Sequence, residues 1–167
     1  MKLIKATEKD IPLIQDLARR SWEKAYAEIL SKEQMEYMLS EMYSDTEIAG
    51  HLQNPHYHYY LIQDENNASY EGFIGYEHHY EDNATKLHRI YLVPESKGKG
   101  FGKEALLFLN QKVRESGNER IILNVNKYNS AKKFYESQGY RVYGEGVFDI
   151  GNGFVMDDYL MEFLIHS

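Results

Sequence analysis

A glycine-rich loop, Lys97-Gly98-Lys99-Gly100-Phe101-Gly102, joins a strand-like segment to a helix-like segment and constrains the fold more than any other feature of the chain. Glycine lets backbone N–H groups approach an anion because it has no Cβ in the way. The start of a helix adds roughly half a positive charge, and Lys97, Lys99 and Lys103 add full charges. The loop therefore predicts a phosphate site at a helix N-terminus.

Two familiar nucleotide motifs do not fit this loop. A dinucleotide fingerprint that begins at Gly98 needs glycine at position 103, where the chain has Lys103. A P-loop that ends in Gly102-Lys103 needs glycine at 97 and Ser or Thr at 104, where the chain has Lys97 and Glu104. An acetyl-CoA site also uses closely spaced glycines between a strand and a helix. The remaining alternative is a glycine-rich turn with lysines that keep it hydrated.

Apolar periodicity predicts the other elements of the chain. The expected strands are 3–7, 59–62, 72–76, 87–93, 121–125, 140–143 and 155–164, with a hairpin turn at 151–153. The expected helices start after Thr7, run over about 31–42 and 100–115, and run from Asn129 or Ser130 to Gly139. This order predicts an α/β fold with a mixed central sheet and helices on both faces.

Composition limits the classes of protein to which the chain can belong. Its 167 residues fit one domain, 1–167, and the absence of cysteine excludes disulfides, cysteine-ligated zinc and a cysteine nucleophile. A formal net charge of −7 gives no general attraction to nucleic acid or anionic membranes. No apolar run approaches the roughly 20 residues that span a bilayer, and residues 1–5 do not resemble a signal peptide. A cytoplasmic protein without a nucleic-acid or membrane partner is expected.

Three segments resemble the GNAT superfamily of N-acetyltransferases. Residues 87–105 resemble its main cofactor motif, 124–140 are similar to its second motif, and 4–10 resemble its first strand and helix entry. The resemblance spans most of the chain in the family's order. It implies the acyl-CoA N-acyltransferase fold, acetyl-CoA as the cofactor, and transfer of the acetyl group to an amine by direct attack in a ternary complex.

The resemblance also implies which residues bind the cofactor. The strand before the loop would pair with the pantetheine arm, the loop amides would hold the pyrophosphate, and an asparagine of the second motif would contact the cofactor. Relatives usually begin the loop with Gln or Arg, whereas this chain has Lys97, which still offers a donor. The implied residues are Tyr91, Leu92, Val93, Lys97, Gly98, Lys99, Gly100, Phe101, Gly102, Lys103 and Asn129.

Two catalytic residues are expected on the same grounds. Tyr135 matches the tyrosine near the cofactor sulfur, which protonates the leaving thiolate, although a buried aromatic is the alternative interpretation. Many relatives take the amine proton with a glutamate at the position of Lys86. His88 could substitute because its pKa suits the task. A histidine on a strand face is the alternative, and Glu23 and Glu28 are other candidates.

The acceptor site in this family is built by the first helices and the last hairpin. Residues 29–39 with 42–43 resemble the helical segment of bacterial polyamine acetyltransferases. Aromatic rings and carboxylates suit a polyamine cation, whereas ordinary packing is the alternative. The candidate residues are Trp22, Glu23, Tyr26, Glu28, Tyr37, Tyr43, Asp149, Asp157 and Asp158. A small-molecule amine is therefore the expected substrate.

Other possibilities remain open at this point. The acceptor could be a protein N-terminus, an amino acid or an aminoglycoside, and a non-catalytic acyl-CoA-binding module would have the same fold. The pairs His56-x-His58 and His78-His79 do not have helical ligand spacing, so no metal is expected. Dimers are common among relatives, so a homodimer is the expected assembly.

Overall fold

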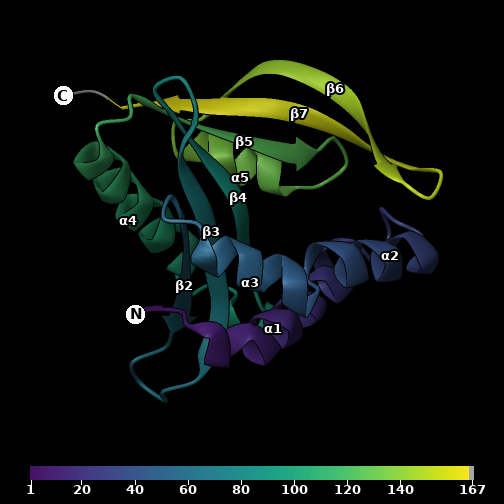
Figure 1. Ribbon diagram of the computed structural model, residues 1–167, viewed down its shortest axis with the longest axis horizontal. Coiled ribbons are helices and arrows are strands. Elements are labelled where there is room, and N and C mark those ends of the chain that lie inside the picture. The colour runs from purple at the N-terminus through teal and green to yellow at the C-terminus, as the bar shows by residue number, and fades with distance from the viewer. Residues whose placement is uncertain (166–167) are drawn as a thin grey trace.

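A computed structural model describes residues 1–165 of the protein. Its strands form one seven-stranded sheet in the order β1-β2-β3-β4-β5-β7-β6 (Figure 1). The strands are β1 Lys2–Lys5, β2 Tyr57–Gln63, β3 Tyr70–Glu81, β4 Ala84–Leu92, β5 Arg120–Asn126, β6 Arg141–Gly151 and β7 Phe154–Leu164. The helices are α1 Ile11–Ala25, α2 Lys32–Met42, α3 Asp45–Gln53, α4 Phe101–Ser116 and α5 Ala131–Ser137, with short 3-10 turns at Glu8–Asp10 and Pro94–Ser96.

Helices cover both faces of the sheet, as the sequence predicts. The apolar sides of α1, α2 and α3 pack on one face, where Trp22 and Phe73 belong to the same buried cluster. Helices α4 and α5 pack on the other face, where Leu109 and Tyr135 join a second cluster with strand residues such as Ile121. All pairings are antiparallel except that of β4 with β5, so the sheet is mixed.

Helix α3 was not expected from the sequence. It is short, its interior contains Gly50, and Ile48 is its one fully buried residue. Its start is nevertheless well defined, because the Ser44 hydroxyl accepts the Glu47 N–H at 3.1 Å as an N-cap. A single buried residue produces no 3.6-residue periodicity, and this explains the missing prediction.

Strands β4 and β5 diverge after a short stretch of pairing. Their parallel register covers only Ala84–Lys86 on β4 and Arg120–Ile122 on β5, although both strands continue. β4 also contains a bulge at His88, because Leu87 pairs with Tyr76 and Arg89 pairs with Gly75. The sheet therefore opens between the second halves of β4 and β5.

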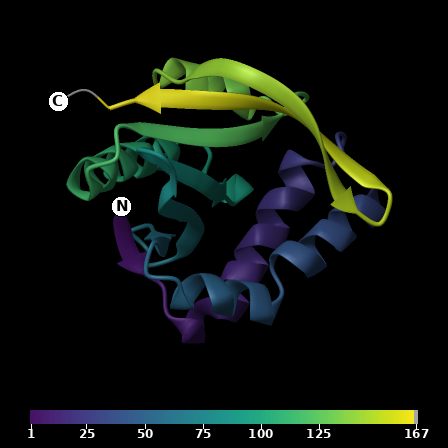
Figure 2. The ribbon, with the colours of Figure 1, turned by 45° about the horizontal axis from the view of Figure 1, so that its top comes forward.

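The β6–β7 hairpin is long and reaches across the molecule to α2 (Figure 2). Gln34 Nε2 donates to the Val155 carbonyl at 2.9 Å, and the Tyr37 hydroxyl donates to the Ile150 carbonyl at 3.0 Å. Gly151 and Gly153 adopt positive φ at the turn between the two strands, as the glycine pattern predicts. Within residues 1–165, no helix is long and apolar enough to cross a bilayer.

Candidate active site

A cavity of about 190 Å³ lies where β4 and β5 separate. Its walls come from α1, β4, β5 and the start of α5, and they include Tyr26, Leu92, Asn124, Asn129 and Tyr135. Segments that are distant in the sequence therefore meet at the one place where the sheet is open. Binding sites of mixed α/β proteins commonly occupy such openings.

A second hollow of about 400 Å³ lies over the glycine loop and the start of α4. Leu92 lines both cavities, so they adjoin along the end of β4. The second hollow is lined by Val93, Lys97, Gly98, Gly100, Phe101, Gly102 and Lys103, together with Phe134 of α5. Most of the residues predicted to bind the cofactor therefore line a single continuous region.

The loop backbone presents N–H donors to this hollow. Gly98 and Gly100 have φ values of 85° and 75°, in the left-handed region where glycine is favoured, and their N–H groups have no acceptor within residues 1–165. The first hydrogen bond of α4 runs from Glu104 N–H to the Gly100 carbonyl at 3.2 Å. The N–H groups of Gly102 and Lys103 precede this bond, so they are among the unpaired donors at the helix start.

Lys99 lies differently from its predicted position. Its N–H donates to the Ser96 carbonyl at 3.1 Å. Its ammonium is 2.9 Å from Asp64 Oδ2 and 2.6 Å from Glu71 Oε1, and it does not line the hollow. Lys97 also uses its N–H, which donates to the Pro94 carbonyl, but the residue lines the hollow. Lys99 therefore holds the loop in place instead of contacting a ligand there.

Along the end of β4, the backbone N–H and C=O groups that do not pair with β3 come from every second residue. Val93 N–H donates to the Glu71 carbonyl at 2.8 Å, and in an antiparallel ladder residues two apart face the same partner. The backbone groups of Tyr91 and Val93 therefore face β3, whereas those of Ile90 and Leu92 face the opening toward β5. Ile90 was not among the residues predicted to bind the cofactor, although the two-residue period of a strand could have indicated it.

Asn129 and Tyr135 both lie at the cavity, as their positions in the second motif imply. Asn129 Oδ1 accepts the Ala131 N–H at 2.9 Å, as a side chain that caps the start of α5 does. Tyr135 is buried, and this burial raises the pKa of its hydroxyl. The hydroxyl therefore keeps its proton at neutral pH and can act as a donor.

His88 is held by three neighbouring side chains. Its Nε2 lies 3.0 Å from Glu77 Oε1, its ring stacks on Tyr57 at 5.0 Å, and the ring of Tyr80 meets it edge-on. Burial lowers the pKa of His88 to about 4, even though Glu77 acts in the opposite direction. His88 is therefore neutral near pH 7, with Nδ1 as the nitrogen that makes no hydrogen bond among the described residues.

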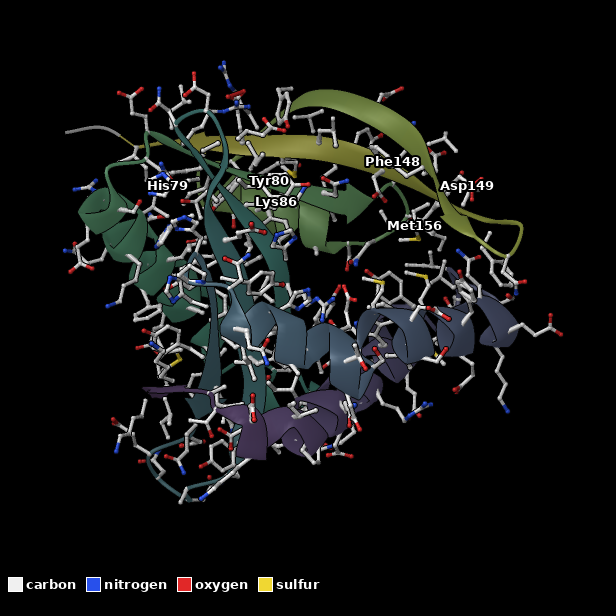
Figure 3. The ribbon with its side chains drawn as sticks, viewed as in Figure 1. His79, Tyr80, Lys86, Phe148, Asp149 and Met156 are labelled. Carbon is white, nitrogen blue, oxygen red and sulfur yellow. The ribbon has the colours of Figure 1, made fainter. Side chains whose placement is uncertain are left out.

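Lys86 reaches across from β4 to β5. Its ammonium donates to Asn124 Oδ1 and lies 5.6 Å from the centre of the Tyr80 ring, beside which Figure 3 shows it. Asn124 Nδ2 in turn donates to Asp158 Oδ2 at 3.4 Å. Burial lowers the pKa of Lys86 and raises the pKa of Asp158.

The aromatic residues expected at the acceptor site fall into two groups. Tyr26 lines the cavity. Trp22 and Tyr43 are buried in the core beneath α1 and do not line it. Tyr37 packs on Phe154 of the hairpin at 5.5 Å between ring centres. Packing is therefore the main role of Trp22 and Tyr43, whereas Tyr26 serves both the core and the cavity.

The five predicted acidic residues also differ in how close they lie to the cavity. Glu23 and Glu28 are exposed at the end of α1 and beyond it. Asp149, on the outer arm of the hairpin in Figure 3, accepts the Gly151 N–H at 2.8 Å within the turn. Asp157 pairs with Lys127 at 3.1 Å. Of the five predicted carboxylates, Asp158 alone has a hydrogen bond to a residue that lines the cavity.

Arg89 is a buried charge that the sequence analysis did not single out. It donates to the Tyr59 hydroxyl at 2.9 Å and to the Met42 carbonyl at 2.8 Å, and its guanidinium lies 4.1 Å from the Tyr43 ring centre. An arginine beside the apolar run Ile90-Tyr91-Leu92 was the available signal. Within residues 1–165, no three His, Asp or Glu side chains converge as metal ligands would.

An opened sheet beside a helix start with unpaired N–H donors is the arrangement of one class of protein, the acyl-CoA-dependent N-acyltransferases. Residues 26–161 match the family model described as "Acetyltransferase (GNAT) domain". The chain therefore belongs to the GNAT acetyltransferase family. The family match and the shared fold confirm the predictions of an acetyl-CoA-dependent N-acetyltransferase and of its fold.

Known proteins resemble the chain over most of its length. An uncharacterized N-acetyltransferase in the pepI 3′ region of Lactobacillus delbrueckii subsp. lactis is 25% identical over 172 residues, which cover 99% of this chain and 95% of that protein. The spermidine N(1)-acetyltransferase of Thermoplasma acidophilum is 28% identical over 145 residues, 85% of this chain and 89% of that protein.

Solved structures share the fold. The PaiA N-acetyltransferase from Thermoplasma acidophilum, solved in complex with coenzyme A, superposes with a TM-score of 0.81 at 26% identity over 98% of each chain. A chimera of the spermidine N-acetyltransferase SpeG from Vibrio cholerae and hSSAT gives a TM-score of 0.73 at 21% identity, over 98% of this chain and 94% of the chimera.

Proposed function

We propose that this protein transfers the acetyl group of acetyl-CoA to a primary amine of a small molecule, with polyamines as the acceptor class, by direct attack in a ternary complex. The observation that carries the proposal is the meeting of two cavities at Leu92. One lies at the unpaired donors of α4, and the other lies between the separated strands β4 and β5, beside Tyr135. A phosphate-bearing thioester that follows the edge of β4 would place its reactive end at Tyr135.

The cofactor would be held largely by the backbone. The N–H groups of Gly98, Gly100, Gly102 and Lys103 suit the pyrophosphate, and the partial charge of the helix start adds to them. Ile90 and Leu92 would pair with the pantetheine arm as a further strand. The amide nitrogen of Asn129 would bond to the same arm. When bound, acetyl-CoA supplies an activated acetyl group on sulfur.

Proton transfer would fall to the side chains around the cavity. The Tyr135 hydroxyl, protonated at neutral pH, would donate to the departing sulfur. His88 stays a prediction as the proton acceptor, through Nδ1. Its ring is neutral, as the role requires, but a pKa of about 4 makes it a weak base.

The polyamine assignment is supported by two observations. Relatives named for spermidine acetylation match this chain over 85% of its length in sequence and 98% in structure. The net charge of −7 favours cationic ligands.

The decisive experiment measures the release of free thiol from acetyl-CoA with a panel of amines. The panel contains spermidine, spermine, an aminoglycoside, a free amino acid and a peptide with a free N-terminus. The proposal expects turnover with the polyamines at the highest kcat/KM. Turnover restricted to peptides or amino acids would contradict the polyamine assignment.

Calorimetric titration with coenzyme A and with NADH tests the cofactor separately. Binding of coenzyme A without turnover of any amine would favour a non-catalytic acyl-CoA-binding module. The homodimer expected from the resemblance stays a prediction, which light scattering of the purified protein tests.

A further inference from the structure

The chemistry proposed above, on which this inference rests, needs a group that takes a proton from the acceptor. A primary ammonium has a pKa near 10 and must become an amine before it can attack. A lysine occupies the position where the family resemblance leads one to expect a glutamate, and a cation there repels the ammonium. The carboxylate must therefore lie elsewhere, or another group must replace it.

Three side chains from three strands form a hydrogen-bonded chain beside the opening of the sheet. Lys86 is the last β4 residue paired with β5, and its ammonium donates to Asn124 Oδ1. Asn124 lies two residues beyond the last paired residue of β5 and lines the cavity. Its Nδ2 donates to Asp158 Oδ2 at 3.4 Å. A carboxylate of β7 thus lies one hydrogen bond behind the cavity wall, which Asp158 itself does not line.

The direction of this chain is fixed by chemistry. An ammonium has donors only, so the Asn124 atom that faces Lys86 must be the carbonyl oxygen. The amide NH₂ then faces Asp158, where it can only donate. Lys86 therefore determines which end of the amide meets the carboxylate, and it does so without contacting Asp158 itself.

Asp158 is buried without a full set of partners. It is 6% exposed, and its Oδ1 has no hydrogen-bond donor among the residues that the structure describes. A second acidic residue on the same strand, Glu162, is also buried, at 8% exposure. Glu162, however, lies 3.6 Å from Arg120 and 3.7 Å from Arg141.

This contrast between two buried acids on one strand is informative. A buried carboxylate oxygen that lacks a donor destabilises the fold, and such groups often serve a catalytic or binding role. Burial is also the main reason that the pKa of Asp158 is raised, which brings it nearer to neutral pH and makes it a stronger base. Tyr26, which lines the cavity, is close enough for its pKa to be affected by Asp158.

We infer that Asp158 is the carboxylate that takes the proton of an acceptor ammonium bound at the cavity wall beside Asn124, with Asn124 and Lys86 as positioning residues. The ammonium gives one proton to the Asp158 carboxylate and becomes the free amine. The nitrogen then forms a bond to the acetyl carbon as the bond from that carbon to sulfur breaks, and sulfur takes the Tyr135 proton. The second proton of the nitrogen restores Tyr135, and the proton on Asp158 passes to solvent.

The central variant is Asp158→Asn, which keeps the shape of the side chain and removes a buried charge. It is expected to fold with a Tm at or above that of the wild type and to bind coenzyme A with unchanged Kd. Its kcat/KM for spermidine should fall by about a hundredfold at neutral pH and recover as pH rises toward the pKa of the amine. The matched control Glu162→Gln removes the other buried acid of β7 and should keep the wild-type pH profile.

Two further variants test Lys86 as a positioning residue and His88 as the alternative proton acceptor. Lys86→Met removes a nearby positive charge, so the acid limb of the pH profile should move to higher pH, while a merely structural residue would change Tm alone. His88→Gln tests the competing assignment, because it should lose the acid limb only if His88 takes the proton of the acceptor. If Asp158→Asn keeps that limb and His88→Gln loses it, Asp158 is not the proton acceptor and the role belongs to His88.

Assays of the wild-type protein distinguish failure of the Asp158 inference from failure of the proposed function. If the wild-type protein acetylates amines and Asp158→Asn shows the same pH profile as the wild type, the inference fails and the proposed function stands. If it binds coenzyme A and acetylates none of the amines, the proposed function fails and the inference falls with it. NMR titration of carboxyl-labelled protein adds a readout that needs no turnover, because Asp158 should titrate above ordinary aspartates.

Discussion

The ammonium group of Lys99 lies 2.6 Å from Oε1 of Glu71, and this contact ties the glycine loop to β3. A second contact, at 2.9 Å, joins the same ammonium to Asp64, just after β2. Both carboxylates are buried, and hydrogen bonds from Lys99 lower the pKa of Asp64. One lysine thus anchors the loop to two neighbouring strands and fixes the backbone donors of Gly98 and Gly100.

The first prediction concerns this anchor. Lys99→Met leaves two buried carboxylates without their cation and frees the loop to move. The loop must then be ordered again on binding, so the Kd for coenzyme A should rise by about tenfold, with a lower Tm. Calorimetric titration and thermal unfolding measure the two effects.

Lys112→Met is a suitable control for Lys99→Met, because Lys112 lies on α4 away from the loop and, among residues 1–165, forms an ion pair with Glu115 alone, at 3.7 Å. It should leave the Kd for coenzyme A unchanged. Equal Kd values for Lys99→Met and the wild type would show that the loop keeps its shape without the anchor.

The second prediction concerns Tyr135. Tyr135→Phe removes the hydroxyl from the cavity wall but keeps the buried ring, so the fold and the Kd for coenzyme A should be unchanged. The kcat should fall by about a hundredfold, because the departing sulfur loses its proton donor. Steady-state kinetics with spermidine measure this change. A kcat equal to that of the wild type at every pH would exclude Tyr135 from the acid role.

The sequence predicts the fold well because its signals are local. All seven expected strands and the four expected helices are present, since apolar periodicity, capping residues and glycine turns act over a few residues. The glycine loop is likewise found at a helix start, with α4 beginning at Phe101. Helix α3 was missed because one buried residue, Ile48, gives no periodicity.

The positions of single side chains could not be predicted in the same way. The bulge at His88 places both His88 and Arg89 on the side of α1–α3, whereas Leu87 and Ile90 pack on the side of α4. One extra residue in a strand moves every following side chain to the opposite face of the sheet, and no local sequence pattern predicts the bulge. The role of Lys99 depends on Glu71, which is distant in the sequence and meets it only through the sheet.

The third prediction concerns acid stability. His78 bonds through Nδ1 to the Thr85 hydroxyl at 2.9 Å and lies among other imidazoles, with the ring of His58 at 5.3 Å. Burial lowers the pKa of His78 from 6.5 to about 4. Between these values the unfolded chain binds a proton that the folded protein does not, so the free energy of unfolding should decrease as pH falls from 6.5 toward 4.

Urea unfolding at about pH 7 and about pH 5 measures this loss. His78→Gln should lose less stability over this interval than the wild type does. His56→Gln, which removes an exposed imidazole nearby, should lose nearly as much stability as the wild type does, because burial outweighs the charge of His56 in lowering the pKa of His78. Identical pH dependence for His78→Gln and the wild type would assign the loss to other groups.

The fourth prediction concerns Gly50 and Gly117, which differ in one physical respect. A Cβ added at either position would meet no atom within 4 Å. Gly50 lies inside α3 without a positive φ, whereas Gly117 ends α4 with φ at 84°. Gly50→Ala should therefore raise the free energy of unfolding by about 0.5–1 kcal/mol, because alanine loses less backbone entropy in a helix.

Gly117→Ala should lower the free energy of unfolding by about 1 kcal/mol, because a side chain is strained in the left-handed region. Urea unfolding of both variants gives the two values, and neither position lies at the cavities, so acetyl transfer should be unchanged in both. Since space is equal at the two sites, opposite signs isolate the effect of backbone conformation. A loss of stability in Gly50→Ala would mean that α3 does not hold Gly50 in a regular helical turn.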